Sequence, residues 1–228
     1  MTVDILHDDG DLIAVNKPSG VVVHRGWNGA DRPMLQRVRD HVGAYVYLVH
    51  RLDRATSGVL LFTRRQTSAS ELGQRLEAGS FRKEYVALVR GHLGRRNPAA
   101  LTASGMLIDH PVPRTEHGAR IEAQTTVWCL AESQNERCSL VRAQPHTGRL
   151  HQIRRHLKHL AHPVVGDVRY GDGRVNRHFR DNYDLHRLWL HATSLEVPLG
   201  EGKSLMVTAP LGPDLRDGLE RLGLTDVL

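Results

Sequence analysis

Short runs of apolar residues, separated by turn-forming residues, dominate the first third of the chain. The runs at 5–6 and 12–15 flank Asp8-Asp9-Gly10, a pattern typical of a β-hairpin. The run Val59-Leu60-Leu61-Phe62 shows no alternation with polar residues, so we expect a strand that is buried on both faces. Further extended segments are expected at 45–49, 58–63, 83–89, 125–130 paired with 139–143, 188–195 and 205–208.

Helical patterns are expected in four segments, at 34–41, 68–76, 150–160 and 213–222. Ser68 is expected to cap the second of these helices and Gly79 to end it. Residues 91–120, rich in Gly, Pro and Arg, are expected to form an irregular surface excursion, and residues 172–187 to mix loop and helix. Strands outnumber helices and occur in runs, which indicates an α+β fold with a mixed, mostly antiparallel sheet flanked by helices.

The length of 228 residues fits one large domain or two small ones, and we find no internal repeat or dividing linker. We therefore expect a single domain over residues 1–228. No apolar stretch approaches the roughly 18 residues of a membrane span, and the first residues lack the features of a signal peptide. Two cysteines, Cys129 and Cys138, do not make a disulfide framework, which favours a reducing cytoplasm and a place for both thiols in the core.

Positive charge is concentrated in one part of the chain. The formal net charge is +6, and residues 139–166 contain no Asp or Glu. The basic residues inside this stretch are Arg142, Arg149, Arg154, Arg155 and Lys158. Such one-sided charge is expected of a protein that binds nucleic acid, although many basic proteins bind no specific partner.

Arg154 is a charged residue at the border of the apolar stripe of the expected helix at 150–160. The apolar stripe of that helix consists of Leu150, Ile153, Leu157, Leu160 and Ala161, and the polar face of His151, Arg155, Lys158, His159 and His162. Arg154 falls at the border, roughly 70° from the centre of the stripe. From there its guanidinium either reaches inward to an anion, for which Asp53 is the candidate, or extends to solvent as an ordinary surface arginine.

Asp53 itself lies where a loop meets the core. It stands between Arg51 and Arg54 in His50-Arg51-Leu52-Asp53-Arg54-Ala55-Thr56-Ser57-Gly58, directly before the buried strand. A carboxylate is rarely placed there unless it is paired or chemically active. Two interpretations remain open at this point: a structural acid paired with a neighbouring arginine, or a reactive carboxylate.

Several other kinds of site find no support in the sequence. His151, His156, His159 and His162 follow no zinc-binding spacing and have no Cys or acid among them. The glycine-rich segment at 166–173 lacks the Gly-Lys-Ser/Thr of a phosphate-binding loop and is better interpreted as a turn. No Gly-x-Ser-x-Gly motif is present. We therefore expect no metal and no nucleotide cofactor.

The motif around Asp53 resembles the signature of the RluA-type pseudouridine synthases, and further segments match the same family in order. They are Asn16-Lys17-Pro18-Ser19-Gly20 with His24, Lys83-Glu84-Tyr85-Val86-Ala87, Thr147 to Leu157, Gly166-Asp167, Leu190-His191-Ala192 and Ala209-Pro210-Leu211. The resemblance runs from about residue 5 to residue 215. It implies an isomerase that converts uridine to pseudouridine in RNA and that needs no cofactor.

The resemblance also assigns roles to residues. It implies that Asp53 is the catalytic aspartate, that Tyr85 packs against the target uracil and that Arg154 pairs with Asp53. Asp53 then acts either as a nucleophile on C1′ or as a base that takes a ribose proton, and the sequence does not choose between them. Arg51 is the residue that fills or braces the space vacated by a flipped base. Arg149, Arg155 and Lys158 are expected to contact phosphates.

Finer features resemble the TruC subgroup, synthases that act on uridine 65 of tRNA. They are His24-Arg25-Gly26-Trp27, Arg154 to Pro163, and Gly171-Asp172 through Asn176. As in that subgroup, the chain is expected to lack an S4-type N-terminal RNA-binding domain, and we expect a monomer. The alternatives are a ribosomal RNA synthase of the same family, a non-catalytic RNA-binding module on the same fold, and an enzyme that hydrolyses small nucleosides.

Overall fold

The computed structural model describes residues 2–24, 32–116, 118–200 and 202–225. It divides the chain into two compact units, each built from two segments. Unit 1 comprises residues 1–83 and 192–210, and unit 2 comprises residues 84–191 and 211–228. The expectation of one domain over 1–228 stays a prediction. In the described part of the chain, none of the helices is long and apolar enough to cross a membrane.

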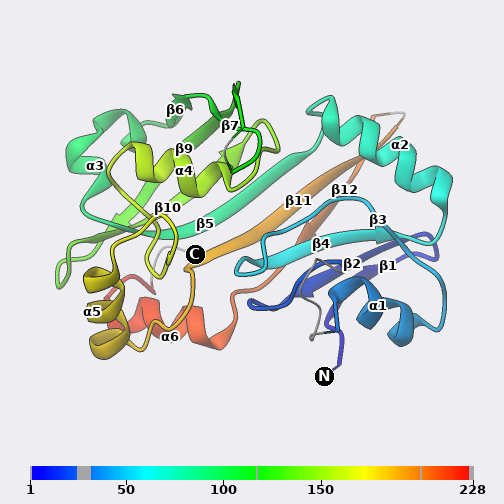
Figure 1. The fold of residues 1–228 in the computed structure, drawn as a ribbon, viewed down its shortest axis with the longest axis horizontal. Coiled ribbons are helices and arrows are strands. Elements are labelled where there is room, and N and C mark those ends of the chain that lie inside the picture. Colours follow the sequence, from blue (N-terminus) through cyan, green and yellow to red (C-terminus); the bar gives the residue numbers. More distant parts are fainter. Residues whose placement is uncertain (1, 25–31, 117, 201, 226–228) are drawn as a thin grey trace. The chain divides into compact units, whose positions relative to one another are not determined.

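Unit 1 is built on antiparallel strands, with β2 between β1 and β4, β3 also against β4, and β11 against β12. Its elements, shown in Figure 1, are β1 (Ile5–Asp8), β2 (Leu12–Lys17), α1 (Met34–Val42), β3 (Tyr47–Leu48), β4 (Ser57–Thr63), α2 (Gln66–Glu77), most of β11 (Leu190–Gly200) and β12 (Lys203–Thr208). The predicted hairpin at Asp8-Asp9-Gly10 is confirmed. Every residue of β4 is buried, which confirms a strand covered on both faces.

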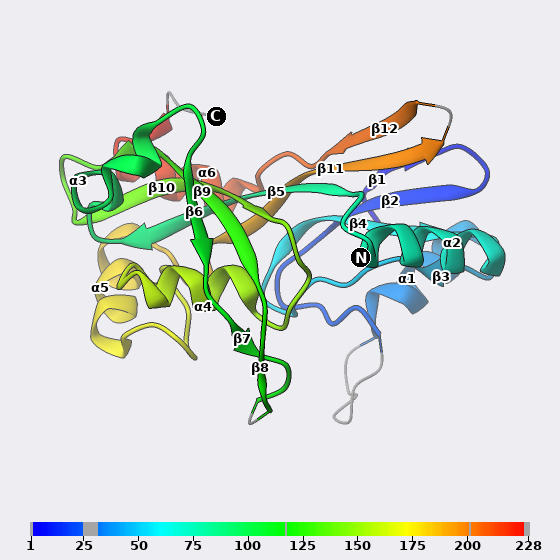
Figure 2. The ribbon, with the colours of Figure 1, turned by 90° about the horizontal axis from the view of Figure 1, so that it is seen from above.

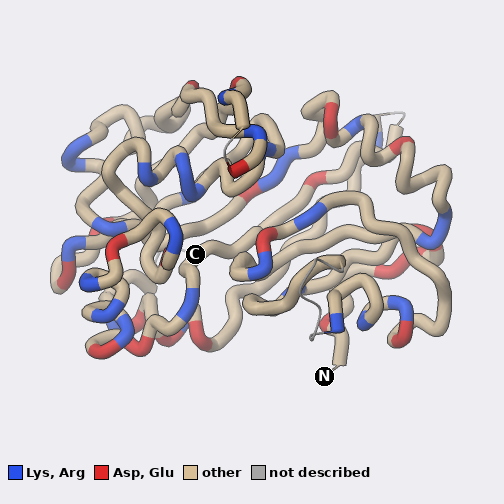
Figure 3. Tube along the Cα trace, viewed as in Figure 1, with Lys and Arg blue, Asp and Glu red and all other residues tan. Residues whose placement is uncertain are grey.

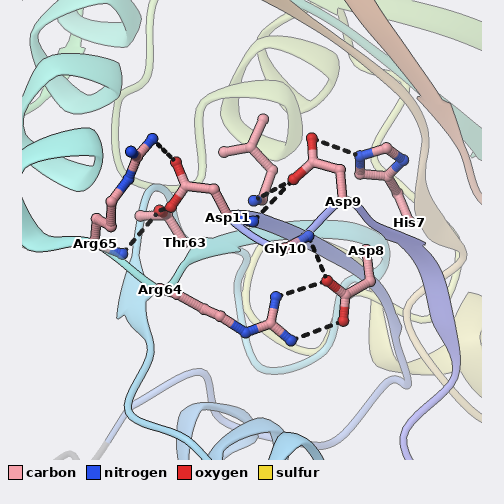
Figure 4. A network of polar contacts seen from close by, with 9 residues as sticks. His7, Asp8, Asp9, Gly10, Asp11, Thr63, Arg64 and Arg65 are labelled. Carbon is pink, nitrogen blue, oxygen red and sulfur yellow. Dashed lines mark hydrogen bonds and ion pairs between the residues drawn. The ribbon is translucent and has the colours of Figure 1, made fainter.

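A polar network surrounds the turn that joins β1 to β2 (Figure 4). Asp8 binds the Arg64 guanidinium through both carboxylate oxygens, at 2.6 and 2.8 Å. Asp11 accepts hydrogen bonds from the Thr63 and Ser68 hydroxyls, at 2.7 and 2.9 Å, and from Arg65. These contacts tie the hairpin to the residues that follow β4.

The same network explains why α2 begins earlier than expected. The helix starts at Gln66 after Arg65, so Ser68 lies inside its first turn and the prediction that Ser68 caps it was wrong. The Ser68 hydroxyl is instead committed to Asp11, 57 residues away in the sequence. Gly79, with φ of 77°, follows the end of the helix, where a left-handed backbone favours glycine.

Unit 2 is built on the antiparallel order β5–β10–β9–β6, and β7 pairs with β8 in a separate hairpin. Its elements are most of β5 (Arg82–Arg90), α3 (Leu93–Arg96), the 3₁₀ helix η1 (Pro98–Leu101), β6 (Met106–Asp109), β7 (Val112–Pro113), β8 (Arg120–Ile121), β9 (Gln124–Glu132), β10 (Cys138–Pro145), α4 (Gln152–His159), α5 (Gly173–Tyr183) and α6 (Pro213–Arg221). Figure 2 shows the β7–β8 hairpin projecting beyond the ends of β6 and β9.

Residues 91–120 are more regular than expected. They contain α3, η1 and β6, and β6 is hydrogen-bonded to β9 from Met106 opposite Val127 to Asp109 opposite Gln124. The pairing partner of β6 lies beyond the segment itself, so local composition gave no sign of it. The predicted pairing of 125–130 with 139–143 is confirmed by β9 and β10.

The helix α4 starts at Gln152, two residues later than expected. His151 adopts a left-handed conformation with φ of 54°, which places Leu150 outside the helix, where it is exposed. His162, expected on the solvated face, is also beyond the helix and is buried, with Nδ1 2.7 Å from the carbonyl oxygen of Arg90. The core of the stripe, Ile153 and Leu157, is buried as expected.

Replacing Asp11 by alanine should lower the free energy of unfolding by about 1–2 kcal/mol, because three donors lose their shared acceptor. Asp4→Ala is the matched control, since Asp4 accepts one side-chain hydrogen bond, from Asn16, at an exposed site. Urea unfolding of both variants measures the difference. Equal losses in the two variants would contradict a special role for the Asp11 network.

Candidate active site

Asp53 is half-buried in the turn that leads into β4, as the sequence predicted. Its carbonyl oxygen accepts a hydrogen bond from the amide of Thr56 at 3.1 Å, which closes the turn. The strand that follows is fully buried, so this turn is anchored on the core on its C-terminal side. The rest of its position is fixed by contacts with residues distant in the sequence.

A buried lysine forms the first of these contacts. Lys17, at the end of β2, is 0% exposed, and its ammonium donates to the carbonyl oxygens of Pro18, Val21 and Arg54 at 2.8, 2.9 and 3.2 Å. Burial of a charged group is costly unless its donors are satisfied, and three carbonyls match the three N–H groups of an ammonium. Lys17 therefore ties the residue next to Asp53 to segment 18–21.

Two further groups of segment 18–21 hold the same turn. The Ser19 hydroxyl donates to the carbonyl oxygen of Ala55 at 2.7 Å. The amide of Gly20 donates to the carbonyl of Arg54 at 2.8 Å, and Nε of Arg54 donates back to the carbonyl of Gly20 at 2.8 Å. We refer to these contacts, together with Lys17, as the loop clasp. It restrains the backbone on the C-terminal side of Asp53.

His50 restrains the N-terminal side. Its Nε2 accepts a hydrogen bond from the amide of Leu61 at 3.1 Å, while the amide of Val49 donates to the carbonyl of Leu61 at 3.1 Å. The imidazole thus takes the place of a backbone acceptor against β4. Burial lowers the pKa of His50 to about 4, and the positive charge of Lys83 acts in the same direction. The ring is therefore neutral at pH 7, as an acceptor must be.

Gly58 follows the turn and lets β4 approach β11 closely. Its φ is 112°, and a Cβ added there would lie 2.1 Å from the carbonyl oxygen of Ala192. No side chain fits at that distance, so the glycine of the motif is required by the backbone contact. Both residues belong to unit 1.

Tyr85 and Arg154 belong to unit 2. Tyr85 is half-buried on β5 and lies opposite Ala143 of β10, which in turn lies opposite Val127 of β9. Side chains two residues apart on a strand share a face, so Tyr85 lies on the same face as Thr125. Thr125 is bound by Gln152 and His156 of α4, so Tyr85 projects on the face that α4 covers.

Arg154 is buried on α4 and makes an ion pair that the sequence analysis did not identify. Its Nε and Nη2 donate to the two carboxylate oxygens of Asp167, at 2.7 and 2.9 Å. Burial alone would raise the pKa of Asp167, but the bonds from Arg154 and from the amides of Tyr170 and Arg169 lower it below its usual value. Arg154 therefore does meet a buried anion. Its pairing with Asp53 stays a prediction, because the two residues lie in different units.

Arg155, expected to contact phosphate, is engaged inside unit 2. Its Nε donates to the Tyr170 hydroxyl at 2.9 Å and its Nη1 to the carbonyl of Pro113 at 2.8 Å. Nδ1 of His151 lies 2.9 Å from the same hydroxyl. These bonds attach the β7–β8 hairpin to α4. Arg155 therefore has a structural role, because it joins α4 to the β7–β8 hairpin.

The other predicted RNA-binding residues are exposed. Arg51 and Lys158 lie on the surface, and exposed Arg149 donates through Nε to the carbonyl of Glu122 at 3.2 Å. Along α4 the charged positions are all basic (Figure 3). Among the described residues, no group of three or more His, Cys, Asp or Glu side chains is placed to hold a metal ion.

Comparison with known proteins decides the family. The model of the RNA pseudouridylate synthase family matches residues 11–159. This chain belongs to that family. Members are isomerases that convert uridine to pseudouridine in RNA, so the predicted enzyme class is confirmed.

Relatives cover nearly the whole chain. The tRNA pseudouridine synthase C of Pasteurella multocida (strain Pm70) is 41% identical over 208 residues, covering 86% of this chain and 85% of the relative. The protein of the same name from Salmonella typhimurium is 36% identical over 248 residues, covering 99% and 92%. The similarity to the RNA pseudouridylate synthases therefore extends well beyond the motifs.

A solved structure shows the same fold. Human RNA Pseudouridylate Synthase Domain Containing 4 superimposes with a TM-score of 0.75 at 24% identity, covering 96% of this chain and 93% of that chain. The α+β fold with a mostly antiparallel sheet is confirmed. Residues 25–27, part of the pattern that resembles the TruC subgroup, lie outside the described residues.

The groups that hold the predicted catalytic residues in place were not predicted from the sequence. Lys17 was identified only as part of a family motif, and Gly166-Asp167 only as a family match within a segment interpreted as a turn. The available signals were a lysine at the end of an apolar strand and an acid two residues after Val165. Both are buried charges, and each is satisfied by partners that only the fold brings to it.

The buried His50 should make stability depend on pH. In the unfolded chain the ring titrates near 6.5, and in the folded chain at about 4. The unfolded state therefore binds more protons below pH 6.5, and the free energy of unfolding should fall between pH 6.5 and 4, by at most about 3 kcal/mol. His50→Asn keeps an acceptor and removes the titration, so urea unfolding at several pH values should show a shallower slope. Parallel curves for variant and wild type would contradict this account.

Proposed function

We propose that this chain is a tRNA pseudouridine synthase and that its target is uridine 65. The observation that carries the proposal is the 41% identity, over most of both chains, with a relative named tRNA pseudouridine synthase C. The acid-free basic stretch at 139–166 supports a polyanionic substrate, since cations that neutralise phosphates release counterions. We further propose that the protein acts as a monomer in the cytoplasm, where its free Cys129 and Cys138 stay reduced.

The reaction breaks the N1–C1′ bond of uridine, turns the uracil and joins C5 to C1′. The hydrogen on C5 then leaves as a proton, and N1 gains one, so atoms balance without a co-substrate. Uracil is a stabilised anion when it leaves, so one carboxylate suffices where glycosidases use two. In our proposal Asp53 is that carboxylate, and it acts in its ionised form, either on C1′ or on a ribose proton.

The other two proposed catalytic residues act on the base and on the acid. Tyr85 offers a flat apolar ring to the uracil and a hydroxyl to its polar edge. Arg154 favours the ionised form of Asp53 and orients it. The bidentate bond to Asp167 supports this role, because it fixes the orientation of the guanidinium on α4 before substrate binds.

A paired uridine must leave its stem before any of these groups can reach it, and in our proposal Arg51 braces the vacated space. Arg149 and Lys158 contact phosphates, which adds affinity without selecting sequence. Arg155 contributes mainly through the β7–β8 hairpin, since its guanidinium is bound to Tyr170 and Pro113.

The test is tritium release from C5-labelled uridine in tRNA transcripts. Wild type should release tritium, and Asp53→Asn should be slower by at least about a thousand-fold while its RNA affinity stays within a few-fold. Asp217→Asn, at an exposed site on α6, is the matched control and should retain full activity. A transcript with cytidine in place of uridine 65 should release one equivalent less.

Each alternative has its own outcome. Tritium release from ribosomal RNA alone would confirm the reaction but exclude tRNA as the substrate. Release from free uridine would indicate an enzyme of small nucleosides. Wild-type turnover by Asp53→Asn would show that Asp53 is not the catalytic carboxylate. Binding of RNA without release from any substrate would favour a non-catalytic module.

A further inference from the structure

Arg142 of unit 2 makes no ion pair with any residue that the structure describes. Arg142 lies on β10, opposite Trp128 of β9 and Val86 of β5. It is one residue out of phase with Ala143 and Val141, so it projects on the sheet face opposite to the one that α4 covers. Neither α4 nor Tyr85 shares that face, so Arg142 is separate from the candidate active site.

The guanidinium of Arg142 stacks on an indole instead of binding an acid. Its Cζ lies 4.1 Å from the centroid of the Trp128 ring. Within the described residues, Arg142 makes no hydrogen bond and no ion pair, and its buried Nε has no acceptor. The residue as a whole is half-buried. Buried polar groups without a partner are rare in folded proteins, and each one calls for an explanation.

The indole that supports Arg142 is itself held in place. Nε1 of Trp128 donates to the carbonyl oxygen of Ala103 at 3.1 Å. Gly105 packs against the ring, since a Cβ added to this glycine would lie 2.6 Å from Nε1 and Cε2 of the indole. The support for the guanidinium is therefore built from β9 and from the turn before β6, and its orientation is fixed in advance.

The surroundings do not neutralise this charge. Some other arginines of unit 2 do have acid partners, for example Arg95 with Glu132 at 3.1 Å and Arg154 with Asp167. Glu84 lies diagonally across β5 from Arg142, two residues before Val86, and no ion pair joins it to Arg142 in the described structure. The stretch 139–166 around Arg142 contains no acid at all.

We propose that Arg142, supported by Trp128, binds a phosphate-type oxyanion. A guanidinium presents a planar set of donors that fits two oxygens of a phosphate, and stacking on an indole leaves the edge of that plane available. The indole covers one face of the guanidinium and the buried Nε faces the protein, so the anion takes the remaining donors at the edge of the plane. The oxyanion is either a phosphate of the RNA backbone or a free phosphate ion, and the experiment distinguishes the two.

The first arm of the experiment titrates the full chain with inorganic phosphate and follows tryptophan fluorescence. The wild-type signal should saturate, Arg142→Gln should weaken phosphate binding at least ten-fold, and Arg142→Lys should give an intermediate loss because it keeps the charge without the planar stack. Arg95→Gln is the matched control, since it also removes one positive charge, and its phosphate affinity should stay within two-fold of wild type.

The second arm measures tRNA affinity against salt concentration. A lost phosphate contact should reduce the slope of log K against log salt by about one in Arg142→Gln and leave it unchanged in Arg95→Gln. A change in this arm assigns the site to the RNA backbone, and a change in the phosphate arm alone assigns it to a free anion. Turnover at saturating RNA should stay at the wild-type level, so failure of this proposal is distinct from failure of the proposed function.

The proposal is overturned if Arg142→Gln, shown by circular dichroism to be folded, changes neither phosphate affinity nor the salt slope. A lower melting temperature with both binding readouts unchanged would likewise show that the stack on Trp128 serves packing alone. If Arg142→Gln does not fold, Arg142→Lys carries both arms and the same criteria.

Discussion

The ammonium of Lys17 is the interaction on which unit 1 depends for the position of its proposed catalytic acid. A charge that is fully buried destabilises a protein unless all its donors are bound, and here two acceptors come from segment 18–21 and one from Arg54 in the acid-bearing turn. Because the ammonium must keep these carbonyls, segment 18–21 and the turn at 53–56 are held together. The Ser19 hydroxyl and the Arg54 guanidinium repeat the connection, and His50 fixes the other side of the turn to β4.

Unit 2 presents its proposed catalytic arginine in a comparable way. Arg154 is buried on α4 and bound by both oxygens of Asp167, whose other contacts are backbone amides of the same loop. Separation of the two partners would leave a buried charge uncompensated, which is strongly unfavourable. Arg154 and Asp167 therefore stay paired in the folded protein. Each proposed catalytic charge is thus positioned by neighbours that take no part in the chemistry, which is how a site is prepared before its substrate binds.

The local features of this arrangement can be predicted from the sequence, whereas the contacts between segments distant in the chain cannot. Local patterns predicted the hairpin at Asp8-Asp9-Gly10, the fully buried β4 and the half-buried Asp53, because each depends on neighbours along the chain. The start of α2, the pairing of β6 and the partner of Arg154 depend on residues 13 to 57 positions away. No local pattern encodes such contacts. The family resemblance identified Asp53, Tyr85 and Arg154, but it did not explain what holds them.

The most direct test of this account is the single-turnover rate constant of Lys17→Met on saturating tRNA, with affinity and secondary structure measured on the same sample. Methionine fills a similar volume but donates no hydrogen bond, so the turn that carries Asp53 loses its main tether while the fold keeps its packing. We expect a folded variant with wild-type RNA affinity and a rate constant at least ten-fold lower, because misplacement of a reacting group by about 1 Å is enough for such a loss. A folded variant that isomerises uridine at the wild-type rate would contradict the claim that the loop clasp positions the catalytic acid.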